Sequence, residues 1–131
     1  MSLSVRVQPV TVIIETDGLE LGKPVGSGHC VALMQRKGNL PITSRWRRGA
    51  EVRGNAMPRG TAIATFSDAG AYENAVDGRS HAAILLEETD DGLRVLDQWI
   101  GRPLAERVIR FKNGAGQKCD DGDQYFAIEV A

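Results

Sequence analysis

The sequence predicts an α+β fold, in which short N-terminal helices pack on an antiparallel sheet of about five strands. The first observation behind this prediction is a helix-like apolar pattern at 29–37, directly after the glycine-rich segment 26–28. The second is that the chain beyond position 60 consists mainly of short β-branched and aliphatic runs separated by turn residues. Helices followed by consecutive strands are typical of α+β domains.

The first 28 residues predict an extended segment and a loop. Residues 5–14 are rich in β-branched side chains, which favour strands, and Pro9 restricts part of this segment to an edge or an irregular arm. Residues 18–28 are punctuated by glycine and predict a loop.

Two short helices are expected next. The first spans 29–37 and ends at Gly38, where a left-handed C-terminal cap is easily formed. The second carries Trp46 and ends near Gly49. One of the two hydroxyl residues at 43–44 can cap its N-terminus.

The rest of the chain predicts strands. A proline–glycine turn at 58–60 precedes the first strand, and 88–92 joins two apolar runs as in a β-hairpin. The expected strands are 61–66, 81–87, 93–97, 107–111 and 125–130. Because the chain has no repeat, low-complexity tract or linker, residues 1–131 are expected to form a single domain.

Length and composition are those of an ordinary globular chain. At 131 residues it can bury roughly two thirds of the surface that its unfolded form exposes, so it needs no disulfide framework. Hydrophobic residues make up 42% and charged residues 25%, which argues against intrinsic disorder. No apolar run approaches the roughly 18 to 20 residues of a membrane span, and residues 1–6 lack the apolar core of a signal peptide. We therefore expect neither a membrane span nor export by the general secretory route.

The net charge of −1 conceals a segregation of charge along the chain. Residues 31–66 hold seven basic side chains and one acid, whereas residues 68–91 hold seven acids and one base. A basic patch suits a substrate that carries carboxylates, but a solvated face would have the same composition. The basic cluster at 45–48 is short and the overall charge is not basic, so a nucleic-acid partner is not expected.

Three residues in different predicted elements form the pattern of a cysteine hydrolase. Cys30 begins the first helix, where unpaired amide groups and the helix dipole favour the nucleophilic thiolate. His81 begins one strand and supplies a base, and Asp97 ends the next strand and supplies a carboxylate to orient it. A buried structural thiol is the alternative for Cys30, because free cysteine is among the most buried residue types.

Strand alternation predicts where the two polar side chains point. His81 shares a strand face with Ala83, and Asp97 shares one with Val95, so both lie at strand ends beside small or apolar neighbours. Gln98 is a weaker candidate for the orienting group, because it points to the opposite face. A rigid sheet can therefore present a base and its acid to the start of a helix.

The remaining cysteine and acidic residues predict neither a metal site nor a disulfide. Cys119 lies in the acidic loop 116–123, whose charges raise the pKa of a thiol and make it a poor nucleophile. Zinc would need ligand pairs such as C-x₂-C or H-x₃-H, and adjacent His29 and Cys30 have poor chelating geometry. The acidic turn lacks the closing glutamate of an EF-hand, so calcium is not expected and no cofactor is implied.

Five features occur in order between Val25 and Trp99. They are a Gly-x-Cys helix start, a tryptophan followed by glycine and valine, a proline–glycine turn into a strand, a strand that begins with histidine, and an acid one hairpin later. In this chain they lie at 28–30, 46–52, 58–64, 81–84 and 97. The ordered set resembles the CHAP and NlpC/P60 group of papain-like peptidoglycan amidases and endopeptidases. Within this group, the chain most resembles the small amidase effectors that bacteria inject through type VI secretion. The resemblance lies in its small size and in the segments 60–66 and 95–99.

This resemblance implies a papain-like NlpC/P60-type domain and an acyl-enzyme mechanism through Cys30, His81 and Asp97. Two positions depart from the pattern of the group. CHAP domains often have a glutamine directly before the cysteine, and this glutamine can donate a hydrogen bond to the oxyanion. This chain has His29 at that position, which either donates the same hydrogen bond or faces solvent. The third catalytic residue of the group is often histidine, glutamate or asparagine. This chain has Asp97 in that place, and a carboxylate can also orient the imidazole.

The resemblance also implies a substrate, a partner and a location. It implies hydrolysis of an amide bond in a stem or cross-bridge peptide of peptidoglycan by an antibacterial effector. Such an effector is made in the bacterial cytoplasm without a signal peptide and delivered to the periplasm of a target cell, which implies a cognate periplasmic immunity protein. The substrate-binding candidates are Arg45, Trp46, Arg47 and Trp99. The alternatives are a papain-like deamidase or transglutaminase toxin that acts on a protein, and a catalytically inactive wall-binding module.

Overall fold

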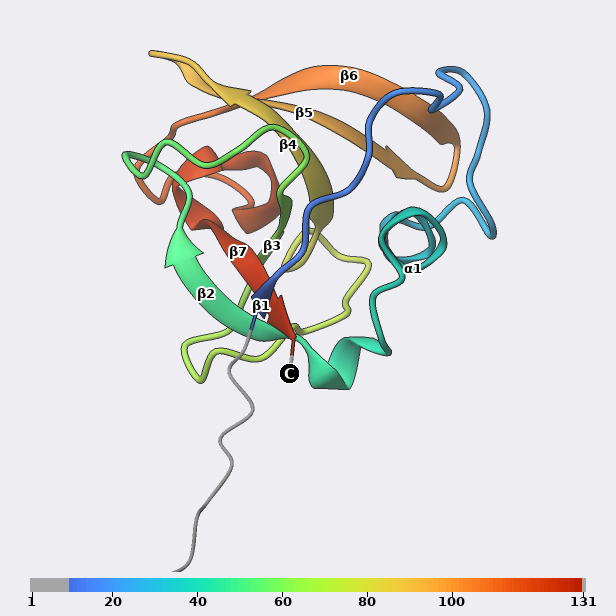
Figure 1. The fold of residues 1–131 in the computed structure, drawn as a ribbon. Helices are drawn as coiled ribbons and strands as arrows, with labels where there is room; N and C mark the ends of the chain where they lie inside the picture. The colour runs from blue at the N-terminus through green and yellow to red at the C-terminus, as the bar shows by residue number, and fades with distance from the viewer. Residues whose placement is uncertain (1–9, 131) are drawn as a thin grey trace, which may run out of the picture.

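A seven-stranded antiparallel sheet forms the centre of the structure, a computed structural model that describes residues 10–130 (Figure 1). The strands follow the order β1-β7-β3-β4-β5-β6, and β2 also pairs with β7. They are β1 (Val10–Thr11), β2 (Arg47–Glu51), β3 (Ala62–Thr65), β4 (Ala82–Glu88), β5 (Gly92–Trp99), β6 (Arg102–Arg110) and β7 (Tyr125–Val130). The other elements are helix α1 (Cys30–Gly38) and three 3₁₀ turns, η1 (Thr43–Arg45), η2 (Lys118–Asp120) and η3 (Gly122–Gln124).

The α+β class is therefore confirmed, but the expectation of about five strands is wrong. The predictions for residues 1–9, including Pro9 and the lack of a signal peptide, lie outside the described residues. Between positions 10 and 130, no helix has the length and apolar character needed to cross a membrane.

Helix α1 packs against β4 and β5 on one side of the sheet. Its buried residues Leu33 and Met34 share a core cluster with Ile84 of β4 and Leu96 of β5. The amphipathic pattern of the helix therefore accounts for its docking, because its apolar side faces the sheet. This docking brings the first residue of α1 to the end of the sheet at which β4 begins.

The helix runs one residue further than predicted, through Gly38, and Asn39 takes the left-handed cap with φ of 52°. Gly38 has no unusual backbone angle, but its missing side chain leaves room for its neighbours. A Cβ at this position would lie 2.8 Å from Cδ1 of Ile14, so the Ile14 side chain would have to move.

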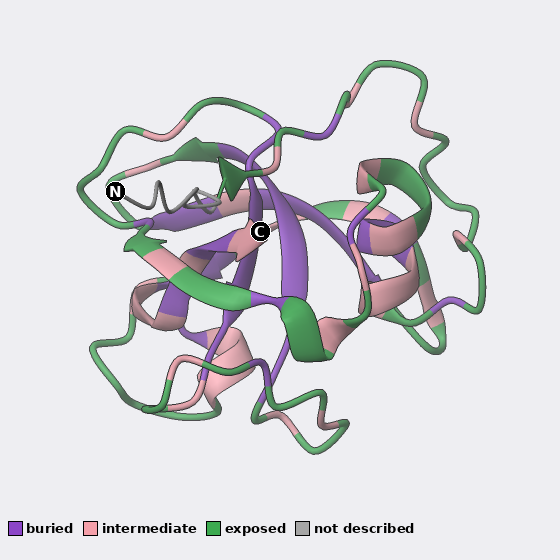
Figure 2. Cartoon of the chain, turned by 60° about the horizontal axis from the view of Figure 1, so that its bottom comes forward, coloured by how far each residue is buried: buried purple, intermediate pink, exposed green. Residues whose placement is uncertain are grey.

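The central strands are buried on both faces and are purple in Figure 2. Along β4, Ile84 and Leu86 join the core beneath α1, whereas Ala83 and Leu85 join a second core on the opposite face. The run 82–86 is therefore continuously apolar rather than alternating. A two-sided core makes β4 a rigid support for the residue that precedes it.

The second predicted helix is wrong. Only η1 is helical there, and Arg47 instead begins β2, which pairs with β7. Trp46 is fully buried, and its indole N–H donates a 3.0 Å hydrogen bond to the carbonyl oxygen of Pro41. The pairing of β2 with the distant β7 overrides the local capping signal.

Strand β6 begins well before the predicted position 107, because β5 and β6 form one tight hairpin. Gly101, with φ of 90°, makes the turn, and Trp99 pairs with Arg102. Pro103 lies within β6, and a proline in the sequence argues against a strand. Because β6 is at the edge of the sheet, a residue without an N–H group is tolerated there. The other predicted strands match β3, β4, β5 and β7 to within one or two residues.

Candidate active site

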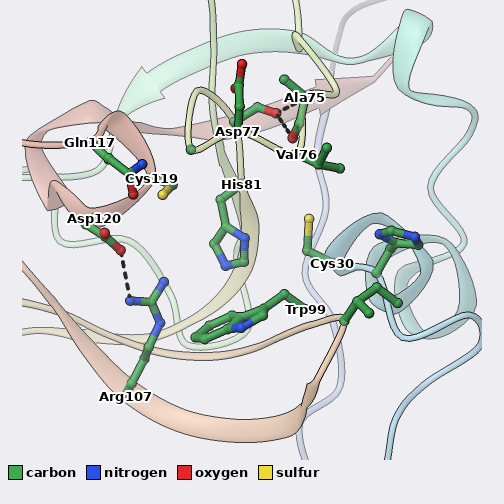
Figure 3. A pocket seen from close by; sticks show the side chains of 14 residues that line it. Cys30, Ala75, Val76, Asp77, His81, Trp99, Arg107, Gln117, Cys119 and Asp120 are labelled. Carbon is green, nitrogen blue, oxygen red and sulfur yellow. Dashed lines mark hydrogen bonds and ion pairs between the residues drawn. The ribbon is translucent and has the colours of Figure 1, made fainter.

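A pocket of about 770 Å³ lies where the start of α1 meets the start of β4 (Figure 3). Cys30 and His81 both line it. The Nε2 atom of His81 is 2.7 Å from Oδ2 of Asp97, which is fully buried. The three residues predicted from sequence to act together are therefore brought together by the fold.

The loop that leads into Cys30 is held by Gln98. The side-chain oxygen of Gln98 accepts a 2.8 Å hydrogen bond from the Val25 N–H, and its NH₂ group donates to the carbonyl oxygens of Val25 and His29 at 2.8 and 2.9 Å. Gln98 thus points to the α1 side of β5, as strand alternation predicts. Its alternative role as the partner of His81 is wrong, because Asp97 occupies that position and Gln98 positions the peptide before Cys30.

The thiol of Cys30 is surrounded by groups that favour its ionised form. Burial raises the pKa of a thiol, but the hydrogen bond and charge of His81, the Tyr72 hydroxyl and the Ala82 N–H together lower the pKa of Cys30 below its ordinary value. The Sγ atom of Cys30 lies 3.6 Å from the hydroxyl oxygen of Tyr72. Burial and the neighbouring Cys30 raise the pKa of Tyr72, so its hydroxyl stays protonated and can donate to sulfur.

His81 is held in its charged form by its two partners. Burial lowers the pKa of an imidazole, but the Asp97 hydrogen bond and the contact with Cys30 raise the pKa of His81 to about 9. Because the pKa of Cys30 is lowered at the same time, both shifts favour a thiolate–imidazolium pair over two neutral side chains.

The buried carboxylate of Asp97 is balanced by two arginines of β6. Its Oδ1 accepts a 2.7 Å hydrogen bond from Arg102, and its Oδ2 accepts a 2.8 Å hydrogen bond from Nε of Arg107. Burial raises the pKa of Asp97, but His81 and Arg107 outweigh burial and lower it. Both guanidinium groups also lie over the ring of Trp99, with distances of 4.5 and 5.1 Å from the guanidinium carbon to the ring centroid.

The two tryptophans among the substrate-binding candidates have different positions. Trp99 lines the pocket, is 42% exposed and packs edge-on against the His81 ring with a 6.0 Å centroid separation. Trp46 is fully buried and packs against Tyr72 at 4.8 Å. The prediction that Trp46 contacts substrate is therefore wrong, and its ring instead supports the tyrosine beside Cys30.

The basic cluster at 45–48 does not border the pocket. Arg45 and Arg47 lie in η1 and β2, and the guanidinium of Arg47 donates to the backbone oxygens of Ser44 and Trp46. Arg107, and neither Arg45 nor Arg47, is among the residues that line the pocket, and a substrate contact for the latter two stays a prediction.

Two further predicted residues lie in the pocket wall. His29 is exposed and makes no capping hydrogen bond with its side chain. Cys119 is a free thiol, as is Cys30, and burial together with Asp120 raises the pKa of Cys119, which disfavours its nucleophilic thiolate. Within residues 10–130, no three His, Cys, Asp or Glu side chains cluster as a metal site would require.

Comparison with known proteins places this geometry in a family. Residues 7–128 match the family described as Domesticated amidase effector 2. The chain belongs to this family. It is 41% identical to a protein named Domesticated amidase effector 2 from Ixodes scapularis, over 81% of this chain and 74% of that protein. It is 33% identical to the type VI secretion amidase effector 2 protein of Salmonella typhi, over 90% of this chain and 98% of that protein.

A solved structure has the same fold. The type 6 secretion amidase effector 2 (Tae2) superposes with a TM-score of 0.76 and 30% sequence identity, over 90% of this chain and 94% of that chain. The resemblance to small type VI secretion amidase effectors that the sequence predicts is confirmed.

Within this amidase effector fold, three residues that the sequence did not assign to the site take part in it. The contacts of Arg102 and Arg107 with Asp97 could not be predicted, because the β5–β6 hairpin was not predicted in full. Only that strand pairing places the two arginines beside Asp97. Tyr72 lies in the long loop between β3 and β4, and its spacing from Cys30 follows no periodic pattern. The available signal for Tyr72 was a single aromatic residue in a loop that could rim a cleft.

Proposed function

We propose that this chain hydrolyses an amide bond in a stem or cross-bridge peptide of peptidoglycan through a cysteine nucleophile. The observation that carries the proposal is that Cys30, the first residue of α1, lines one pocket with His81, whose Nε2 is 2.7 Å from the buried Asp97 carboxylate. Membership of an amidase effector family supports an amide as the bond and the bacterial wall as the substrate. In this proposal the domain is papain-like, of the NlpC/P60 type, in the order and roles of its catalytic residues.

The first half of the reaction forms an acyl-enzyme. The thiolate of Cys30 attacks the carbonyl carbon, and the carbonyl oxygen becomes an oxyanion. The N–H group of Cys30 has no intrahelical acceptor, because Cys30 is the first residue of α1, and it donates to this oxygen. The Tyr72 hydroxyl, 3.6 Å from Sγ, and the side chain of His29 are the candidate second donors. The imidazolium of His81 then gives its proton to the amide nitrogen, the C–N bond breaks, and the amine leaves.

The second half releases the acid. Neutral His81 accepts a proton from water as the water oxygen attacks the thioester carbon. The C–S bond breaks, the carboxylic acid leaves, and Cys30 returns to the thiolate beside a protonated His81. Asp97 holds the imidazole in position throughout and stabilises its charged form.

The proposal extends to delivery and protection. The chain is proposed to act as an antibacterial effector that type VI secretion delivers to the periplasm of a target cell. Support comes from its similarity to the type VI secretion amidase effector 2 protein over nearly the whole of that protein. A producer cell that receives such an enzyme from a sister cell needs a periplasmic immunity protein, which is the partner we propose.

Incubation with purified peptidoglycan, followed by mass spectrometry of the released fragments, tests the proposal. Wild-type protein is expected to release soluble muropeptides, and Cys30→Ala is expected to release none while keeping its melting temperature. Cys119→Ser is the matched control, because it alters the other thiol of the same pocket and should keep nearly the full rate. Hydrolysis by Cys30→Ala would overturn the proposal. Binding to the wall without cleavage by wild-type protein would favour an inactive module.

A further inference from the structure

The imidazole of His81 divides the pocket into two sides. Figure 3 shows the Cys30 thiol on one side and the side chains of Arg107 and Asp120 on the other. Gln117 lines the same side as Asp120, so the wall beyond the imidazole is polar and charged. In the proposed reaction, Arg107 acts only through its hydrogen bond to Asp97.

Arg107 has hydrogen-bonding capacity that this partner does not use. A guanidinium group carries five N–H bonds, and Arg107 gives the one on Nε to Asp97. Its Nη1 atom is 3.6 Å from Oδ1 of Asp120, which is an ion pair but too long for a hydrogen bond. Among residues 10–130, no acceptor takes a hydrogen bond from either Nη group. Because 23% of the Arg107 side chain is exposed and it lines the pocket, a ligand can reach these groups.

The position of His81 determines which half of a substrate meets Arg107. The imidazolium must protonate the leaving nitrogen, so that nitrogen lies on the His81 side of the sulfur. The amine half of the substrate then extends across the imidazole toward Arg107 and Asp120, and the acyl half extends away from them.

We propose that Arg107 binds a carboxylate on the amine half of the substrate, so that the enzyme prefers amides whose leaving amine belongs to a residue with a free carboxylate. This inference rests on the proposed function and names the substrate group that the same site recognises. A guanidinium and a carboxylate form two parallel hydrogen bonds, which give both affinity and orientation. Asp120 is 45% exposed and only loosely paired, so it can turn toward solvent when the substrate carboxylate arrives. Arg107 is thus a positioning residue toward Asp97 and a specificity residue toward substrate.

The test compares two synthetic peptides that differ in one group: the residue that supplies the leaving amine carries either a free carboxylate or a carboxamide. Wild-type kcat/KM is expected to be about 10- to 100-fold higher for the carboxylate peptide, because charge-assisted hydrogen bonds are lost with the carboxamide. In Arg107→Gln this ratio is expected to fall close to one. The ratio is the readout, because the absolute rate also falls when Asp97 loses a partner.

Arg102→Gln is the matched control. Arg102 also binds Asp97, at 2.7 Å, and also lies over Trp99, but it is not among the residues that line the pocket. Its substitution is therefore expected to lower the rate for both peptides and leave their ratio unchanged. An unchanged ratio in Arg107→Gln, or an equal loss of the ratio in Arg102→Gln, would overturn the inference.

Binding of the amine product separates this inference from the proposed function, because it needs no turnover. Calorimetry on Cys30→Ala protein is expected to show about 10-fold or more tighter binding of the carboxylate form than of the carboxamide form, and this difference should vanish when Arg107→Gln is added. Lack of peptide hydrolysis together with this binding preference would refute the proposed function alone. Equal binding of the two forms, or no binding of either, would refute the role of Arg107.

Discussion

Replacement of His81 by glutamine tests whether His81 makes the Cys30 thiol reactive. Glutamine keeps a hydrogen-bonding side chain in the same place but removes the positive charge. An ordinary cysteine pKa is 9.0, and at Cys30 burial is the largest single influence and raises it. The hydrogen bond and charge of His81 are the main contributions that bring the pKa below 9.0. Without them, burial should leave the pKa of Cys30 above its ordinary value.

The expected magnitude follows from the ionisation of a thiol. Two pH units below its pKa, a thiol is about 1% thiolate, so at pH 7 the variant should react with iodoacetamide at no more than about 1% of its own rate at high pH. Each unit by which His81 lowers the pKa multiplies the thiolate fraction about tenfold. We expect the alkylation rate of Cys30 at pH 7 to fall at least about 10-fold in His81→Gln.

The assay is iodoacetamide labelling between pH 5.5 and 10, followed by peptide mass spectrometry for each cysteine. Cys119 is an internal control, because it lines the same pocket and burial together with Asp120 raises its pKa. Cys119 should label slowly at pH 7 in both proteins. A labelling midpoint for Cys30 that is the same in wild type and His81→Gln would refute the reasoning. It would assign the reactive thiolate to the start of α1 alone.

Three further predictions concern the groups around this pair. Asp97→Asn should lower kcat strongly, leave a measurable residual rate, and reduce the free energy of unfolding in urea by about 3 kcal/mol, because it leaves charged partners of a buried carboxylate unpaired. Tyr72→Phe keeps the ring packed on Trp46 but removes the hydroxyl beside Cys30, so kcat should fall about 10-fold with an unchanged circular dichroism spectrum, and an unchanged kcat would exclude a catalytic role. The rate should fall as pH rises through about 9, because deprotonated His81 cannot protonate the leaving amine, and fall again in acid as the Cys30 thiolate is protonated. A rate that keeps rising above pH 9 would contradict this assignment.

The same shift in His81 predicts a direction for folding stability. The pKa of His81 is raised from 6.5 to about 9 in the folded protein, so the folded state binds the proton more tightly than the unfolded state. The resulting stabilisation is fully present below about pH 6.5 and is lost as pH rises through about 9. In a His81→Gln protein this part of the pH dependence of the melting temperature should disappear.

The candidate catalytic residues could be located from sequence because each lies at a boundary that the local sequence reveals. Glycines before an apolar helix mark the start of α1, and Cys30 is its first residue. His81 directly precedes an apolar run too continuous for a surface strand, and Asp97 follows a hairpin turn and a short apolar run. Strand alternation also gave the correct opposite directions of Asp97 and Gln98, because the period of two is a property of any β-strand.

Features that depend on pairing between distant segments were not predictable. Strand β2 exists because Arg47 and Arg48 pair with Glu129 and Ile128, and nothing within 43–51 encodes that partner. Residues 45–48 were therefore expected beside the cysteine, whereas the pocket that contains Cys30 is lined by other residues. Trp46 is instead fully buried against Tyr72, because burial of its large ring, with its N–H bonded to Pro41, stabilises it more than exposure beside a pocket would.

The α+β class, and the elements on which Cys30, His81 and Asp97 lie, could be read from the sequence alone, since they follow from local periodicity, capping and turn chemistry. The tertiary structure alone decided which charged groups complete the site. Arg102 and Arg107 reach Asp97 only through the register of β5 on β6, and Tyr72 reaches Cys30 only because its loop folds over Trp46. The physical reason is that strand register and loop packing are set by contacts between residues far apart in the chain. The free energy of such a contact depends on both segments, so it cannot be inferred from the sequence of either one alone.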